Sequence, residues 1–75
     1  MVIDMIVTDT GDGFTAEVPS LKGCESWAHS DDEVITKIVE LVRFYTNLNE
    51  DTEIIIDQAR KNRNKIVYKL IFNKD

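Results

Sequence analysis

The sequence predicts an α+β fold, in which a small antiparallel sheet carries one helix packed on one face. Three observations support this. Short stretches of alternating apolar residues, separated by turn residues, fill positions 1–29. One long amphipathic stretch follows from Ser30, and two β-branched stretches lie near the C-terminus. The expected order is three strands, a helix, and one or two further strands. Seventy-five residues fit a single domain, 1–75, with a small core.

The first two strands are expected at residues 2–8 and 14–18. The first is rich in Val, Ile and Met, and the second alternates between apolar and polar residues. Between them, Gly11 and Gly13 form a turn signal because glycine adopts positive φ without strain. The two strands therefore form a hairpin.

Pro19 ends the second strand or places it at an edge, because proline donates no hydrogen bond to a neighbouring strand. Residues 24–29 then predict a short third strand. Alternation places two sets of side chains on opposite faces. The small set is Cys24, Ser26 and Ala28, and the large set is Glu25, Trp27 and His29.

A helix is expected to begin after Ser30, which caps it. Glu33 completes a capping box, and Asp31 and Asp32 lie in the positive first turn. Asn47 or Asn49 is expected to end the helix in a left-handed conformation. The apolar stripe consists of Val34, Ile35, Ile38, Leu41, Val42 and Tyr45.

Residues 53–58 and 65–72 predict two more strands, joined by a loop over 60–64. A short helix within residues 51–62 is the alternative. The last strand is apolar on both sides, and a single helix covers only one face of a sheet. We therefore expect self-association into a dimer or tetramer. The set predicted to form its interface is Ile66, Tyr68, Leu70 and Phe72.

The net charge of −5 is unevenly distributed, with −10 over residues 1–59 and +5 over residues 60–75. An acidic body attracts basic proteins and repels nucleic acid, so a nucleic-acid partner is not expected. The basic segment 60–65 is interpreted as offsetting the acidic body, and contact with phosphates is the alternative. No signal peptide or membrane span is apparent, and a cytoplasmic location is expected.

Residues 12–33 resemble the HicB-like antitoxin domain, which has a pattern close to D-G-G-Y-x-A-x-x-P-x-L-P-G-C-x-T before a capped helix. The match covers residues 1–45 well and 46–75 loosely. Ser26 stands at the threonine position, and Val34, Trp27 and His29 replace smaller residues. The matching positions are Asp12, Gly13, Phe14, Ala16, Pro19, Leu21, Gly23, Cys24, Ser30, Asp32 and Glu33.

This resemblance implies a non-enzymatic βββαβ module, similar to part of a ribonuclease H fold but without its carboxylate cluster. Such modules bind a small basic HicA-like ribonuclease toxin, cover its catalytic His and commonly self-associate. A DNA-binding segment is not apparent after Asn49. The alternative is an orphan homo-oligomeric scaffold or regulatory protein without a toxin. We expect the partner-binding residues to share one face of the sheet, and they are Glu17, Glu25, Trp27 and His29.

No catalytic residue, metal site or cofactor is expected. Cys24 is interpreted as a buried thiol, because alternation places His29, the only nearby base, on the opposite face. The acids at the helix start are explained by capping, and Asp9 and Asp12 lack the ligand spacing of a calcium loop. Trp27 could anchor a partner or fill a self-association interface.

Overall fold

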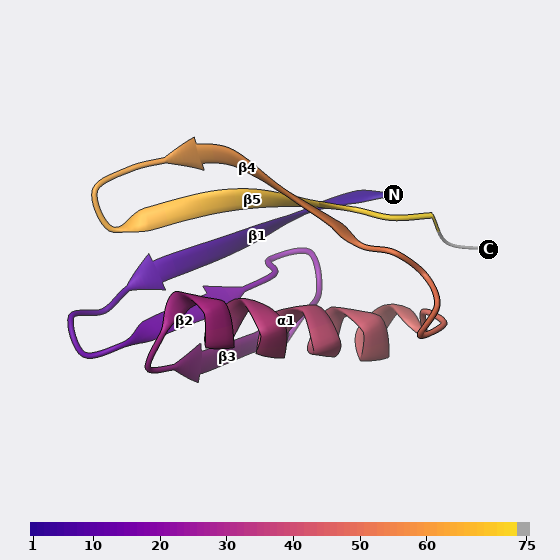
Figure 1. Cartoon of the computed structure of the whole chain (residues 1–75), viewed down its shortest axis with the longest axis horizontal. Helices are drawn as coiled ribbons and strands as arrows, with labels where there is room; N and C mark the ends of the chain where they lie inside the picture. The colour runs from indigo at the N-terminus through magenta and orange to yellow at the C-terminus, as the bar shows by residue number, and fades with distance from the viewer. Residues whose placement is uncertain (74–75) are drawn as a thin grey trace.

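The computed structural model describes residues 1–73 and confirms the predicted α+β fold. The sheet has five antiparallel strands in the order β3-β2-β1-β5-β4, with α1 on one face (Figure 1). Among residues 1–73, no helix is long and apolar enough to cross a membrane. The elements are β1 (Val2–Asp9), β2 (Phe14–Glu17), β3 (Glu25–Ala28), α1 (Asp31–Thr46), β4 (Ile55–Lys61) and β5 (Lys65–Ile71).

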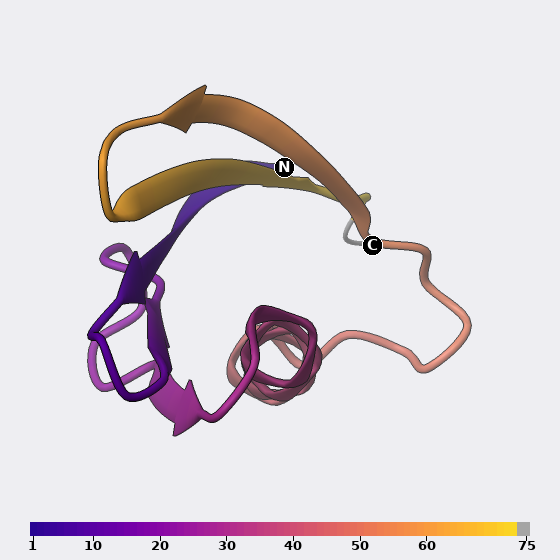
Figure 2. The same cartoon turned by 60° about the vertical axis from the view of Figure 1, so that its left-hand side comes forward.

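The sheet is strongly curved, and α1 lies on its concave side (Figure 2). The backbone of α1 lies close to β3 and β2 and approaches β1 at fewer positions. It does not approach β4 or β5. The second hairpin, β4–β5, therefore extends beyond the helix. The opposite, convex face of the sheet carries no other element of residues 1–73.

The core lies between α1 and the concave face of the sheet. Met5 on β1, Ile38 on α1 and Leu70 on β5 are fully buried. Burial of apolar side chains contributes about 25 cal/mol per Å² removed from water, so these large side chains provide much of the stability. The other buried apolar residues are Ile3, Val7, Ala16, Val18, Cys24, Ala28, Val34, Val42 and Phe72.

The two predicted capping residues, Ser30 and Asn47, both cap α1. The Ser30 hydroxyl accepts a hydrogen bond from the Glu33 backbone N–H at 3.2 Å, and Asn47 ends the helix with φ 55°. The stripe differs at one position. Thr46 is buried and Tyr45 is 43% exposed, because the buried face advances in steps of four from Val34. The Thr46 hydroxyl is satisfied by the Val42 carbonyl at 2.6 Å.

Residues 51–62 include a strand and not the alternative helix, but the predicted boundaries were wrong. β4 extends to Lys61, and the loop is restricted to residues 62–64, where the Asn62 N–H bonds to the Lys65 carbonyl at 2.8 Å. Charged residues persist in β4 because every residue of this edge strand is exposed. A bulge between Gln58 and Arg60 shifts its register against β5.

Candidate protein-binding site

Three of the predicted partner-binding side chains lie together on the convex face of the β2–β3 hairpin. Glu17 lies opposite Glu25, and Thr15 lies opposite Trp27. The three predicted residues of these pairs therefore share one face with Thr15. A shallow hollow of about 490 Å³ lies over the pairs. We call the set Glu17, Glu25, Trp27 and His29 the Trp27 face.

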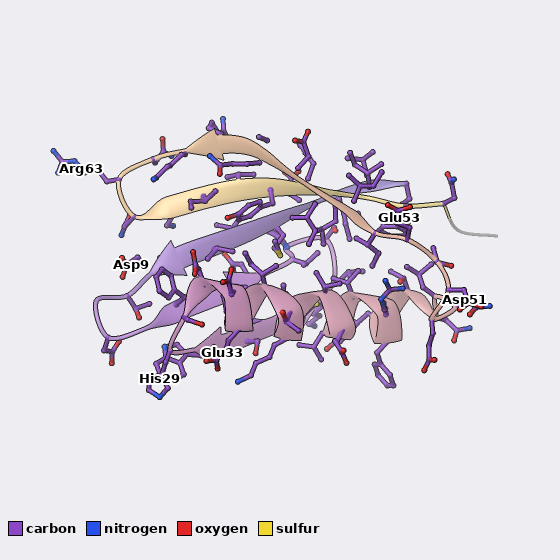
Figure 3. The ribbon with its side chains drawn as sticks, in the orientation of Figure 1. Asp9, His29, Glu33, Asp51, Glu53 and Arg63 are labelled. Atoms are coloured by element: carbon purple, nitrogen blue, oxygen red, sulfur yellow. The ribbon has the colours of Figure 1, made fainter. Side chains whose placement is uncertain are left out.

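His29 joins this set through contact with Trp27. The two rings meet edge to face, with centroids 4.6 Å apart and planes at 75°. Edge-to-face geometry is favourable for aromatic rings, so this contact helps to hold the His29 ring beside Trp27. Figure 3 shows His29 just beyond β3, pointing away from the sheet near Glu33 at the start of α1. The structure thus brings the four predicted residues together.

The charge on the Trp27 face is unfavourable for the isolated chain. Glu17 and Glu25 are both exposed and directly opposite each other on neighbouring strands. Like charges in this arrangement repel and destabilise a sheet. Neither carboxylate takes part in an ion pair within residues 1–73. A cationic group from another molecule would relieve the repulsion.

Gly13 controls the position of Trp27, for a reason that differs from the sequence prediction. The positive φ angles belong to Gly11 and Gly23, and not to Gly13. A Cβ atom at Gly13 would instead collide with Cζ2 of the Trp27 ring and lie 2.7 Å from the Ala28 carbonyl oxygen. The indole therefore lies directly against the Gly13 backbone. Trp27 remains 40% exposed, which leaves much of its side chain available for contact.

The predicted self-association set is wrong for Leu70 and Phe72. Both are buried within the chain's own core, at 0% and 3% exposure, so they are not available to a second copy. Ile66 and Tyr68 are only partly buried, and Tyr68 packs against the same core. The physical reason is that this side of β5 faces the concave interior, where Leu70 pairs with Ile3 of β1.

The convex side of β1, β5 and β4 carries other apolar residues. Val2, Ile71 and Ile55 lie in one row across the three strands, and Ile6 and Val67 lie in another. Val2 and Ile55 are 57% and 51% exposed. Between these rows Lys69 forms an ion pair with Asp4 at 2.5 Å. Both partners are exposed, so this pair adds little stability.

Cys24 is buried, as predicted, and burial raises the pKa of its thiol. Because of the raised pKa, the folded thiol stays protonated and unreactive at pH values at which an exposed thiol would already be ionised.

We expect alkylation of Cys24 by iodoacetamide to be at least about tenfold slower in the native protein than in urea. The unfolded thiol releases its proton at lower pH than the folded one, so stability should fall as pH rises above the unfolded pKa. Mass spectrometry measures the alkylation. A native protein that is alkylated as fast as the unfolded protein would contradict the burial of Cys24.

The clustered carboxylates have structural partners in the chain. The Asp31 carboxylate accepts from the Asp32 N–H at 2.9 Å, and Asp9 accepts from the Gly11 N–H at 2.9 Å. Asp12 accepts from the Thr10 hydroxyl at 3.0 Å. Within residues 1–73, no three His, Cys, Asp or Glu side chains converge on a common point. These contacts place Asp31 at the helix start and Asp9 and Asp12 in the turn after β1.

The basic segment lies beside acidic residues of the body. Lys61, Arg63 and Lys65 border a hollow of about 230 Å³ that Asp9 and Asp31 also line. Figure 3 shows Arg63 and Asp9 at the same end of the molecule. This placement agrees with the interpretation that the basic segment offsets the acidic body.

Two exposed residues of α1 are not among the predicted site residues. Lys37 donates from Nζ to the Trp27 carbonyl oxygen at 3.2 Å. Phe44 is 82% exposed, the largest exposure of any large apolar residue in the described chain. Phe44 does not belong to the buried stripe formed by Val34, Ile38 and Val42. A large aromatic residue on the polar side of a helix is the feature of the sequence that could have predicted an exposed contact residue here.

No protein-family model matches this chain, and neither a search of curated proteins nor a search of solved structures finds a significant match.

Proposed function

We propose that this chain is a non-enzymatic protein-binding module resembling a HicB-family antitoxin, and that its Trp27 face binds and blocks a small basic ribonuclease. The observation that carries the proposal is the directly opposed pair Glu17 and Glu25 beside a partly exposed tryptophan. Tryptophan is among the residues that contribute most to protein interfaces. The sequence resemblance, which supplies the identity of the partner, is independent of this geometry.

The proposed neutralisation is electrostatic and steric. The acidic body accelerates the encounter with a basic protein. Glu17 and Glu25 then face cationic side chains of the partner, which removes the repulsion between the two carboxylates. Trp27 provides an apolar contact at the centre of this surface. The bound module covers the active site of the ribonuclease, and the module itself contributes no chemical step.

The test is to co-express the chain with a basic protein of HicA type encoded beside it and to measure the affinity of the purified pair by calorimetry. Trp27→Ala should weaken binding by at least about tenfold, because it removes a partly exposed interface anchor. Ile55→Ala is the matched control, since Ile55 is at least as exposed but lies on β4. Failure to bind, or equal affinity of the Trp27→Ala variant, would refute the proposal.

The alternative function is a homo-oligomeric scaffold without a toxin. The favouring observation is the apolar convex face of β1, β5 and β4, where Val2 and Ile55 are more than half exposed. Sedimentation velocity of the chain alone distinguishes the alternatives. A stable oligomer without affinity for any neighbouring basic protein supports the scaffold.

A further inference from the structure

The free edge of β3 presents backbone groups that β2 does not pair. The Val18 N–H donates to the Cys24 carbonyl at 2.9 Å, where the two strands begin to pair. In an antiparallel pair, such hydrogen-bonded positions recur at every second residue. Glu25 and Trp27 occupy the intervening positions, so their N–H and C=O groups point away from β2.

Two contacts agree with this direction. The Trp27 carbonyl accepts from Lys37 Nζ at 3.2 Å, and the Glu25 N–H donates to the Gly23 carbonyl at 3.1 Å. The Glu25 carbonyl and the Trp27 N–H are left facing the open edge. The contact with Lys37 is exposed, so water competes for both the ammonium and the carbonyl group. An incoming backbone N–H could therefore replace the lysine.

A groove runs alongside this edge, between β3 and α1. Its volume is about 530 Å³, and Leu41 and Phe44 provide its apolar surface. Phe44 lies on the helix side of the edge, and Trp27 lies on the convex side. A strand added to β3 would alternate its side chains between these two sides. The groove is lined by Ser26, Thr36, Lys37, Glu40, Leu41 and Phe44.

We propose that an extended segment of the protein partner adds to β3 as a further strand of the sheet. Its apolar side chains lie against Leu41 and Phe44, and its basic side chains lie on the convex side next to Glu25, the β3 member of the opposed glutamate pair. Backbone hydrogen bonds to the edge provide affinity, and the alternation of side chains provides specificity. The inference rests on the proposed function, since it specifies how the partner engages the Trp27 face.

The other free edge is less suited to the same segment. β4 contains a bulge between Gln58 and Arg60, and bulges interrupt regular pairing. Arg60 and Lys61 also repel a basic strand. Charge and geometry therefore both favour β3.

The probe is a ten-residue synthetic peptide that alternates lysine and valine. Trp27 is the single tryptophan of the chain, so its fluorescence reports on the β3 edge. We expect a saturable change in Trp27 emission, and shifts of the amide NMR signals of residues 25–28 and 36–44. Phe44→Ala should weaken peptide binding by at least about tenfold without unfolding the protein, because Phe44 is 82% exposed. Ile55→Ala should leave the affinity unchanged.

A pair of N-methylated peptides separates strand addition from simple charge attraction. Both keep the lysine–valine sequence and its charge, but one carries a methyl group on every lysine backbone nitrogen and the other on every valine backbone nitrogen. Alternate residues of a strand direct their N–H groups to opposite edges, so only one of the two peptides loses the donors that face β3. Equal binding of these two peptides would overturn the proposal, as would shifts confined to β4, no saturable binding, or no effect of Phe44→Ala. The proposal would also be overturned if the chain self-associates through the groove and the peptide does not dissociate the oligomer, because a second copy would then occupy that surface.

The same variants distinguish this inference from the proposed function. If the basic ribonuclease binds and Trp27→Ala weakens binding, while Phe44→Ala has no effect, the Trp27 face stands and the added strand is refuted. If the ribonuclease does not bind at all but the lysine–valine peptide does, the groove stands and the proposed partner is refuted.

Discussion

Replacing Leu70 by alanine is expected to lower the free energy of unfolding by about 2–5 kcal/mol, the cost of removing a large side chain from a well-packed core. Leu70 is fully buried on β5 between β1 and β4, and it belongs to the same core cluster as Ile38 and Val42 of α1. Urea denaturation followed by circular dichroism measures the change. A protein of 75 residues has little stability to lose, so the variant should be largely unfolded at 37 °C.

Ile55→Ala provides the control for this substitution. Ile55 pairs with Ile71, which follows Leu70 on β5. Because Ile55 is 51% exposed, its replacement should lower the free energy of unfolding only slightly. The loss of stability in Leu70→Ala should also be independent of protein concentration, because the contacts lie within one chain. A Leu70→Ala variant as stable as the native protein, or destabilised only on dilution, would return Leu70 to a self-association interface.

The second large effect is expected for Gly13→Ala, which should cost about 1–3 kcal/mol and displace Trp27. The added methyl group would collide with the indole and approach the Ala28 carbonyl oxygen to 2.7 Å. The carbonyl belongs to β3 and yields less readily than a side chain. Either the ring moves or the β2–β3 hairpin opens. Denaturation measures the cost, and Trp27 emission together with partner affinity measures the displacement.

Gly11→Ala is the comparison for Gly13→Ala. Gly11 has a φ of 92°, and a Cβ atom at this position would meet no heavy atom within 4 Å, so the cost comes only from backbone strain. We expect Gly11→Ala to be destabilised by about 1–2 kcal/mol with unchanged Trp27 emission. If Gly13→Ala keeps both its stability and its emission, the indole does not depend on this close approach.

Much of the fold could be predicted from local patterns. Ser30 and Asn47 mark the helix ends because capping depends on the chemistry of a few consecutive residues. The alternation over residues 24–29 placed Cys24 and Ala28 inside and Glu25, Trp27 and His29 outside, as the structure has them. The four residues of the Trp27 face were predicted together for the same reason, since they follow from strand periodicity and hairpin pairing.

Other features depend on contacts between distant segments. Both sides of β5 are apolar, so periodicity alone did not distinguish the buried side, and the curvature of the sheet toward α1 places Leu70 and Phe72 inside. The role of Gly13 arises from the Trp27 ring of the neighbouring hairpin strand. The groove beside Phe44 exists because α1 runs alongside the free edge of β3.

The sequence by itself determined the local elements, their order and the residues of one exposed face, because these follow from spacing along the chain. Only the tertiary structure decided which apolar side became core, which glycine supports the tryptophan, and which strand edge lies beside an exposed aromatic residue. The buried side of β5 and the surroundings of the β3 edge depend on how far the sheet curves around a single helix, and the role of Gly13 depends on how β2 pairs with β3. Curvature and pairing are both properties of the assembled strands.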